Sequence, residues 1–372
     1  MGKLQIRVAK AGTCKMKKIG WVAVIGLTVL GAAAFYAYER RSGRISSARA
    51  DMLAMMPSDA SAVVFADLVE LRSSSFLAQL YSWAPAPSPD ADYAQFLKDT
   101  GFNYERDLDR LAIAWMNSGG DSTFLAVADG KFDWQKISAV ALKSGTHAKL
   151  NGRDVFSASE NGGAWKLSFT FLSENRIALT DGPALSVALN ARKRDEDTAE
   201  WRSRFERLGG SPVFAVIRQD AAPGSALSSQ APGGFRSPEL STLLNQLQWI
   251  TVAGKPEGDR LRLIAEGECA SEQTMRALAD VLNGVLLLAQ SGLNDAKTRQ
   301  QLDPALRAAY LDTLKSADVS TFDRGETKSV RLVFDITPAF LEAATHIPAS
   351  SPNAAPAKPA PGNSRRSRKG HT

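Results

Sequence analysis

The longest apolar run in the chain covers residues 19–38, IGWVAVIGLTVLGAAAFYAY, and contains no charged side chain. Twenty helical residues reach about 30 Å, the thickness of the hydrocarbon core of a bilayer. Trp21 near one end, and Tyr36 and Tyr38 near the other, occupy positions typical of aromatic residues at a membrane interface. The pattern predicts a transmembrane helix that begins at Ile19 and contacts the lipid bilayer.

Two other interpretations of this run are a soluble core helix and a cleaved signal peptide. A soluble core helix of this length would show a polar face at helical spacing, and only Thr28 interrupts the apolar and small residues. A cleaved signal peptide that starts at Met16 is the stronger rival, with small residues at 32–34 for a peptidase. We favour an uncleaved anchor because the uncharged run continues to Tyr38. Whether translation starts at Met1 or at Met16 stays open.

Basic residues flank the run on both sides. Six lysines and arginines precede it and four follow it closely, which predicts an N-terminus on the inside. The following domain would then be periplasmic or extracytoplasmic, anchored in the inner (plasma) membrane by a single pass. If the chain begins at Met16 the bias disappears, and the reversed topology would place the domain in the cytosol.

Beyond a juxtamembrane stalk at 39–50, the apolar positions predict strands and helices in two successive stretches, 51–197 and 198–345. In each stretch the predicted order is strand, helix, hairpin, helix and strand, which is the β-α-β-β-α-β type of order. The predicted fold class is therefore α+β, an N-terminal transmembrane helix followed by two ferredoxin-like halves. Because identity between the stretches is slight, two unrelated α+β halves are the alternative.

The clearest local signals are turn and capping residues. Asn151 and Gly152 tolerate the positive φ of a tight turn between two strands. Residues 255–259 connect a second hairpin. Ser271 is placed to cap a long helix, and Pro304 falls in the first turn of the next one.

The long helix after Ser271 is unusual because Val285 to Ala289 is apolar on every side. It is too short for a second membrane span once Arg276 and Asp280 are counted. Burial between the two halves is one interpretation of this helix, and a docking face for a partner helix is the other.

Two segments are predicted to lack regular structure. The residues between Arg218 and Ser237 are rich in Gly, Pro, Ser and Ala, which indicates either a flap over a site or a plain insertion. The Pro/Ala-rich tail at 346–372 is too poor in apolar residues to fold and is predicted to be disordered. A basic patch near its end consists of Arg365, Arg366, Arg368 and Lys369. Such a patch contacts anionic lipids, cell-wall polymers or nucleic acid through charge alone, and it lacks the interleaved aromatics of a specific nucleic-acid site.

Composition narrows the class of protein further. The chain has 372 residues, of which 44% are hydrophobic and 23% charged, as in an ordinary globular protein. The basic residues are concentrated at the ends, including the basic segment 1–18. Residues 50–350 carry 30 basic and 38 acidic side chains, a net charge of about −8. An acidic body argues against a nucleic-acid footprint spread over its surface.

Candidate nucleophiles and bases are few. Cys14 and Cys269 fall on opposite sides of the predicted span, so no disulfide joins them in that topology. Cys269 is predicted to be a half-buried hydrophobic residue in a strand. His147 is the one histidine well inside the predicted fold, and no pattern places it near a serine or a cysteine.

Candidate metal and phosphate sites are equally sparse. The acidic groups Asp107 with Asp109, and 195–197, interleave with arginines and lack the spacing of a calcium loop. No glycine-rich phosphate loop or dinucleotide fingerprint is present. The sequence thus predicts no catalytic residue, no metal ligand and no cofactor.

One stretch of the first half resembles a known group of proteins. Its pieces are the Pro57-x-Asp59 turn, the helix start at Arg72-Ser73-Ser74, and Thr100-Gly101-Phe102 ahead of Asp107-x-Asp109. The stretch resembles uncharacterised bacterial single-span envelope proteins with an exported α+β domain of unknown function. The resemblance implies a location and a fold, and it implies no catalytic residues.

The sequence therefore predicts a membrane-anchored, non-enzymatic cell-envelope domain that acts as a scaffold or an assembly and binding subunit. Its expected partners are the lipid bilayer, through residues 19–38, and an envelope protein whose identity the sequence does not give. Small-molecule ligands are likewise unknown. Two alternatives stay open: an exported hydrolase that uses His147 or the acidic groups, and a cytoplasm-facing regulator if the topology is reversed.

Overall fold

A computed structural model describes residues 47–83, 91–118, 121–160, 165–181, 185–189, 199–219, 242–325 and 327–345. Within these ranges the strands are β1 (Ala62–Asp67), β2 (Leu108–Ser118), β3 (Asp121–Gly130), β4 (Gly145–Leu150), β5 (Arg153–Glu160), β6 (Trp165–Ser173), β7 (Arg176–Thr180), β8 (Val213–Arg218), β9 (Leu247–Glu257), β10 (Arg260–Cys269), β11 (Asp318–Arg324) and β12 (Thr327–Ile336). The helices are α2 (Ser47–Leu53), α3 (Leu68–Arg72), α4 (Ser75–Trp83), α5 (Ala91–Thr100), α6 (Tyr104–Asp107), α7 (Trp134–Ser144), α8 (Leu185–Leu189), α9 (Ala199–Arg207), α11 (Glu272–Asn294), α12 (Ala296–Gln301), α13 (Pro304–Lys315) and α14 (Pro338–Thr345).

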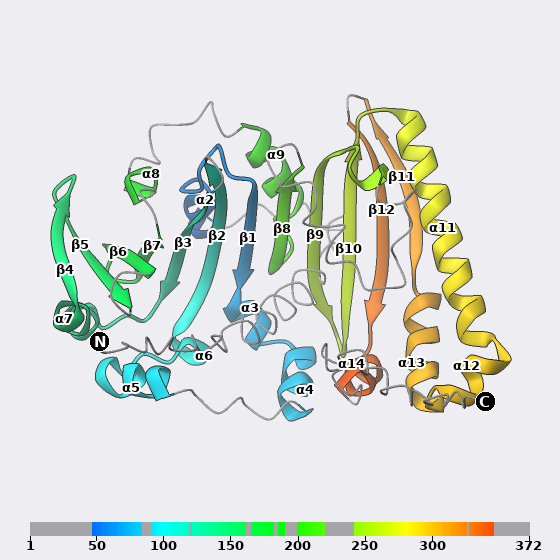
Figure 1. Cartoon of the computed structure of the whole chain (residues 1–372), viewed down its shortest axis with the longest axis horizontal. Helices are drawn as coiled ribbons and strands as arrows, with labels where there is room; N and C mark the ends of the chain where they lie inside the picture. Colours follow the sequence, from blue (N-terminus) through cyan, green and yellow to red (C-terminus); the bar gives the residue numbers. More distant parts are fainter. Residues whose placement is uncertain are drawn as a thin grey trace, which may run out of the picture.

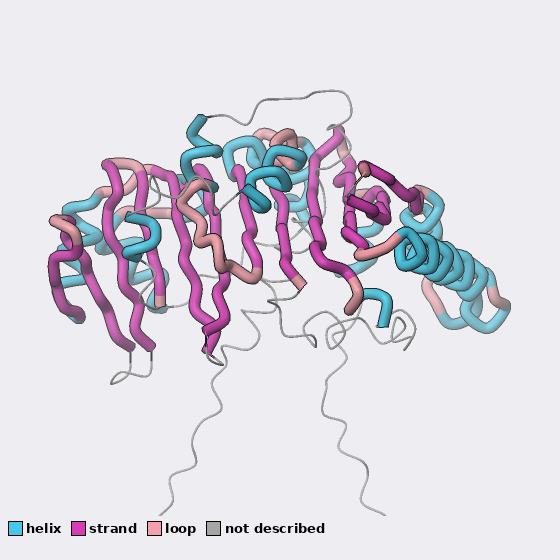
Figure 2. The backbone as a smooth tube through the Cα atoms, turned by 90° about the horizontal axis from the view of Figure 1, so that it is seen from above, coloured by secondary structure: helices cyan, strands magenta, loops and turns pink. Residues whose placement is uncertain are grey.

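All twelve strands belong to one sheet, and every neighbouring pair is antiparallel. Its order is β11-β12-β10-β9-β8-β1-β2-β3-β7-β6-β5-β4, and Figure 1 shows it running across the whole molecule. Seen from above, the sheet is curved, and α11 runs away from it at the β11 end (Figure 2).

The prediction of two ferredoxin-like halves is wrong. A split β-α-β unit places two parallel strands on either side of a third, whereas β1 pairs directly and antiparallel with β2. The reason lies in the connection: helices α3 to α6 stay at one end of the sheet (Figure 1), so the chain re-enters the sheet from the end at which it left. The helices therefore do not cross the sheet between these strands.

The transmembrane part of the predicted fold class is corrected as well. No helix within the described ranges is long and apolar enough to cross a membrane. The segment 19–38, with Ile19, Trp21, Tyr36 and Tyr38, lies outside the described residues, as do the basic segment 1–18 and the tail from residue 346. Residues 47–50, expected to be stalk, instead begin α2, which packs on the sheet.

The strand order is the same on both sides of the sheet's centre. Outward from the central pair β1–β8, one side runs β1-β2-β3-β7-β6 and the other runs β8-β9-β10-β12-β11. On the second side, α11 to α13 carry the chain from one end of β10 to the other end of the sheet (Figure 1). As a result β11 lies parallel to β10, with β12 between them.

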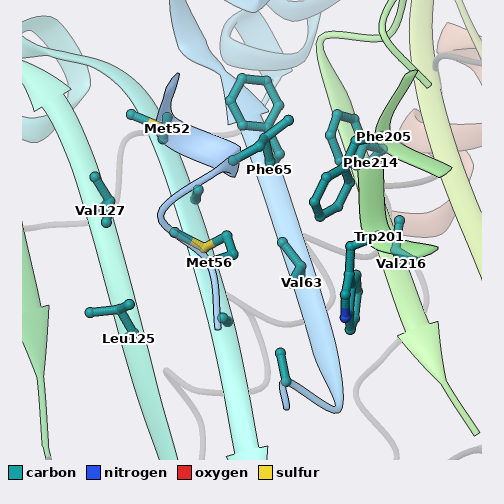
Figure 3. Packing of buried hydrophobic residues seen from close by; sticks show 14 of the residues in the cluster. Met52, Met56, Val63, Phe65, Leu125, Val127, Trp201, Phe205, Phe214 and Val216 are labelled. Carbon is teal, nitrogen blue, oxygen red and sulfur yellow. The ribbon is translucent and has the colours of Figure 1, made fainter. Parts of the chain in front are cut away.

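Residues alternate between the two faces of the sheet, and different helices cover each face. On one face, Val63 and Phe65 of β1 join the largest hydrophobic cluster, to which α2, α8 and α9 contribute. Figure 3 shows Phe65 beside Phe214, and Phe205 of α9 packs on Phe214. Trp201 of α9 packs against Phe205 and Trp249. We call this the α9 face. The opposite face, here the α11 face, is covered by α3, α4, α7, α11 and α14 in smaller clusters.

Several local predictions are confirmed by the structure. Asn151 and Gly152, with φ of 51° and 79°, form the turn between β4 and β5, and Gly258 at φ 64° turns between β9 and β10. Ser271 caps α11 and Pro304 opens α13. These features depend on neighbouring residues alone, which is why the sequence shows them.

Gly145, between α7 and β4, leaves no space for a side chain. A Cβ at this position would lie 2.1 Å from the Ser157 carbonyl oxygen and 2.8 Å from that of Ala141. Because both contacts are backbone atoms, Gly145→Ala is expected to lower the free energy of unfolding by about 1–3 kcal/mol. The midpoint of urea denaturation measures this effect.

The matched control is Gly292→Ala in α11, where a Cβ meets nothing within 4 Å. There the better helix propensity of alanine is expected to leave stability unchanged or raise it by up to about 1 kcal/mol. Equal midpoints for the two variants would contradict the close approach at Gly145.

Candidate functional site

The first half of α11 is attached to the sheet. The Ser271 hydroxyl caps the helix by accepting a hydrogen bond from the Thr274 N–H at 3.1 Å. Met275, Leu278 and Ala279 are buried in the cluster that α11 forms with β9, β10 and β12. This half is an amphipathic helix that covers the α11 face at one end of the sheet.

The second half of the same helix presents leucines to solvent. The side chains of Leu287 and Leu288 are 67% and 74% exposed. They belong to a stripe at the spacing i, i+3, i+4, i+7 and i+8, which is one face of a helix. We call this stripe the leucine surface; its members are Gly284, Leu287, Leu288, Ser291 and Gly292.

Two glycines of the leucine surface are not required by packing within the chain. A Cβ added to Gly284 or to Gly292 would meet no heavy atom within 4 Å. Glycine in a helix costs about 1 kcal/mol relative to alanine. Small residues beside the leucines leave room for another backbone to come close to α11.

The leucine surface is held by a short helical arm, residues 281–315. It consists of the second half of α11 followed by α12 and α13. The Gln290 side chain donates a hydrogen bond to the Leu314 carbonyl oxygen at 3.0 Å and so ties α11 to α13. Residues 281–294 carry no charge. The arm therefore presents an uncharged surface on a helix that is fixed at both ends.

The position of α11 bears on one of the two interpretations of its apolar sequence, burial between the two halves. The helix packs on β10, β11 and β12 at one end of the sheet, not between the two halves (Figure 1). Burial between the halves is therefore wrong for Leu287 and Leu288. Their exposure agrees with the other interpretation, a docking face.

The edge strand next to this arm is β11. Among the described residues it pairs with β12 alone, so its outer edge carries no further strand. Unpaired backbone groups along such an edge accept another strand readily. The leucine surface and the β11 edge thus lie at the same end of the molecule (Figure 2).

Acidic residues on the α9 face form ion pairs with arginines. Asp67, Arg110, Asp129 and Arg176 occupy directly paired positions on β1, β2, β3 and β7. Arg110 Nε lies 3.0 Å from Asp67 Oδ2, and the Arg176 guanidinium donates to both carboxylate oxygens of Asp129. Arg49 of α2, 6% exposed, also contacts Asp67. Each carboxylate faces a guanidinium, which indicates a structural role.

A second ionic network, also on the α9 face, connects α9 with strands β10, β11 and β12. Glu266 and Glu268 of β10 are 2% and 4% exposed. Glu268 accepts hydrogen bonds from Arg204 and Arg207 of α9. Glu266 accepts from Arg324 of β11 at 2.6 Å and from Arg331 of β12 at 3.1 Å.

The pKa of Glu266 shows how the arginines offset burial. Desolvation by burial raises this pKa, while the hydrogen bond from Arg324 and the charges of Arg324, Arg331 and Arg207 lower it. The net pKa lies below the ordinary value of a glutamate. Glu266 is therefore held as a carboxylate rather than poised to exchange a proton near neutral pH.

The candidate nucleophile and base lie far apart. Cys269 is buried, and desolvation raises the pKa of its thiol to about 11, so no thiolate forms near neutral pH. His147 lies on the edge strand β4, where its Nε2 is 2.8 Å from Asp154 Oδ1. Strands β10 and β4 are nine positions apart in the sheet order, roughly 40 Å at the usual strand spacing. The structure does not bring these residues together.

The acidic pair Asp107 and Asp109 is divided between two arginines. Asp107 accepts hydrogen bonds from the Arg106 guanidinium and from the Asn103 N–H. Chiefly the hydrogen bond from Arg106 lowers the pKa of the Asp107 carboxyl to about 2. Asp109 lies 3.3 Å from Arg72. The third acidic group, residues 195–197, lies outside the described residues, as do the tail residues Arg365, Arg366, Arg368 and Lys369.

The described residues contain no cluster of three or more His, Cys, Asp or Glu that suits a metal ion. A depression beside α13 and α14 is lined by small apolar residues and by three charged ones, Arg307, Asp312 and Lys315. All three charged residues come from α13, so they do not converge from several elements as the polar groups of a ligand site do. Among the described residues, the feature that stands out is the exposed apolar surface of α11.

Comparison with known proteins gives little similarity. No family model matches the chain, and no curated protein matches it. Among solved structures, crystal form IV of TP0453 aligns with a TM-score of 0.39 at 10% identity, over 83% of this chain and 98% of that one. Crystal form III gives 0.38 at 10% identity, over 79% and 96% of the two chains. These scores are too low to define a shared fold.

Proposed function

We propose that this protein is a non-enzymatic binding subunit, a scaffold that docks a partner protein through the leucine surface of α11. The observation that carries the proposal is the exposure of Leu287 and Leu288, at 67% and 74%, on an uncharged helix face. Exposed hydrophobic residues scattered singly are normal in proteins, but a contiguous stripe on a fixed helix is typical of a docking site.

Burial of the two leucines supplies a definite driving force. A leucine side chain taken from water into an interface contributes about 1.5–3 kcal/mol. Gly284 and Gly292 add no side chain beyond them, so a partner helix can lie close to α11. An apolar helix face that binds a partner is a common mode of recognition, and here Leu287 and Leu288 would be its two anchors.

The chemistry of the remaining sites supports binding over catalysis. The buried carboxylates at Asp67, Asp129, Glu266 and Glu268 are paired with arginines, and the thiol of Cys269 is protonated near neutral pH. That the protein is not an enzyme stays a prediction. The inner-membrane location also stays a prediction, because the segment 19–38 lies outside the described residues.

Photo-crosslinking tests the docking surface. Benzoylphenylalanine placed at Leu288 in the full chain, in cells that produce it, is expected to form a defined adduct with a protein. The control position is Gln273, which is exposed on the half of α11 that packs on the sheet. Leu287→Glu is expected to reduce the Leu288 adduct severalfold and to change the free energy of unfolding by less than about 0.5 kcal/mol.

Equal adduct yields at Leu288 and Gln273, or a yield that Leu287→Glu leaves unchanged, would contradict a docking role for the leucine surface. Thermal unfolding of the Leu287→Glu variant separates a lost contact from a lost fold. A melting temperature equal to that of the unaltered chain assigns the lost adduct to the surface itself.

A further inference from the structure

The edge strand β11 indicates which partner the leucine surface binds. We infer that this chain pairs with a second copy of itself, β11 against β11, so that the two α11 helices lie on the same face of a continuous sheet. The inference rests on the proposed function, because the leucine surface supplies the apolar area of this contact.

The sequence of β11, DVSTFDR, is complementary to itself when two copies run antiparallel. With Thr321 opposite the Thr321 of the other copy, all seven residues overlap. In this register each Asp318 faces an Arg324, once at each end of the pair. Opposite charges across an antiparallel pair stabilise it, and so do paired threonines.

The side chains of β11 are arranged to permit this register. Val319 packs with the α11 cluster, so Thr321 and Asp323 also face α11, whereas Phe322 faces the other side, under Arg331. Asp323, which would face Val319 of the other copy, is already bound to Lys328.

Arg324 lies at the end of β11, and 33% of its side chain is exposed. It donates to Glu266 at 2.6 Å and to the Ser329 hydroxyl at 3.4 Å, and its guanidinium lies 5.1 Å from the Phe322 ring. A guanidinium has five N–H donors in a planar fork, so it can bind carboxylates on two sides. Asp318 is itself exposed.

The opposite edge of the sheet lacks this complementarity. Antiparallel self-pairing of β4, GTHAKL, places His147 opposite either another His147 or Lys149. No such register sets an acid against a base. Strand β4 contains no acidic residue, so it cannot form the Asp–Arg pairs that β11 forms with its own copy.

The area of the contact requires both elements. Seven extended residues measure about 24 Å, and the edge of one strand alone falls short of the roughly 800 Å² per partner of a stable interface. Because α11 packs on β11 and extends past it (Figure 2), a copy paired at β11 also brings its own helical arm alongside. The leucine surface then adds to the backbone pairing.

A cysteine scan along β11 tests the register. In the full chain with Cys14→Ser, Thr321→Cys is expected to give a covalent dimer under mild oxidation, because Thr321 meets its own copy at the symmetry axis. Asp318→Cys is the matched control in the same strand, since its two copies lie about 20 Å apart in this register. Cys269 is buried and does not contribute.

Sedimentation of the unaltered chain, of mass 40.0 kDa, is expected to show a dimer. Asp318→Arg sets two arginines against each other at both ends of the pair and is expected to weaken the dimer about tenfold or more. Lys149→Asp on β4 is expected to leave the dimer unchanged.

The outcomes separate this inference from the proposed function. A monomer at every concentration, or equal crosslinking from Thr321→Cys and Asp318→Cys, overturns the β11 pairing. If the Leu288 adduct then contains a different protein, the docking surface stands and its partner is another chain. If the adduct is the chain itself and the cysteine scan peaks at Thr321, both are supported.

Discussion

Glu268→Ala is expected to lower the free energy of unfolding by about 3–5 kcal/mol, because it leaves two arginines beneath α9 without their carboxylate. Glu268 is 4% exposed, and the side chains of its partners Arg204 and Arg207 are 12% and 22% exposed. The guanidinium of Arg204 is also stacked on the Trp249 ring at 3.8 Å, so it is not free to turn to solvent.

The size of this effect follows from desolvation. Taking charges out of water is costly, and their mutual attraction repays the cost only while both partners are present. Glu266 lies 3.9 Å from Arg207 and compensates that arginine in part, so the loss is expected at the lower end of this range. Urea denaturation of the unaltered chain and of the Glu268→Ala variant measures the difference in their free energies of unfolding, provided that both show the same dependence on urea concentration.

Glu272→Ala is the matched control. Glu272 pairs with Arg276 one helical turn away, with side chains 54% and 72% exposed. Exposed pairs of this kind contribute at most about 0.5 kcal/mol. A Glu268→Ala variant no less stable than the Glu272→Ala variant would show that the α9 network contributes little to the fold.

Phe65→Ala is the second substitution with a large expected effect, a loss of about 3–5 kcal/mol. Phe65 is fully buried in the central strand β1 and lies directly opposite Phe214 of β8. Their rings, which Figure 3 shows side by side, stack with centroids 5.2 Å apart. The guanidinium of Arg49 lies 4.9 Å from the centroid of the Phe65 ring. Truncation leaves a cavity at the place where the two sides of the sheet meet.

The controls for this substitution separate volume from position. Phe65→Leu keeps most of the volume and is expected to cost less than half as much. Val69→Ala, at a side chain 46% exposed on α3, is expected to change stability by less than about 0.5 kcal/mol. If Phe65→Ala unfolds at the same urea concentration as Val69→Ala, the stacked pair is not central to the core.

Local structure was the part that the sequence made visible. The turn at Asn151 and Gly152, the cap at Ser271 and the start of α13 at Pro304 each depend on a few adjacent residues. These signals act over one turn of chain, and tertiary structure did not override them.

The arrangement of the strands could not be read in the same way. A helix between two strands leads to a parallel or an antiparallel pair according to whether it crosses the sheet or stays at one end. Helices α3 to α6 stay at one end, and α11 crosses. The hydrophobic periodicity of a helix is the same on either path, so the sequence does not show which path the chain takes. The predicted ferredoxin-like order was therefore wrong although the helices and strands themselves were present.

The sequence revealed that the helix of the candidate site is unusual, but it did not reveal where that helix lies in the fold. The sequence showed that α11 is apolar on every side, and only its position at the end of the sheet showed which side meets solvent. The buried ion pairs were missed altogether, although β10 held a signal. Arg262, Glu266 and Glu268 lie on the same face of β10 as the buried Ile264, and apolar or small residues occupy the positions between them. Charged residues at every second position of a covered strand face indicate that the charges are paired.

The central pair β1–β8 has a consequence for synthesis of the chain. Val63 lies opposite Val216, about 150 residues later, and contacts so distant in sequence form slowly. One edge of β1 therefore stays without its neighbour while the ribosome completes the intervening strands. During that interval the unpaired edge of β1 can pair with a strand other than β8. This is the stage at which a chaperone protects such a chain from misassembly.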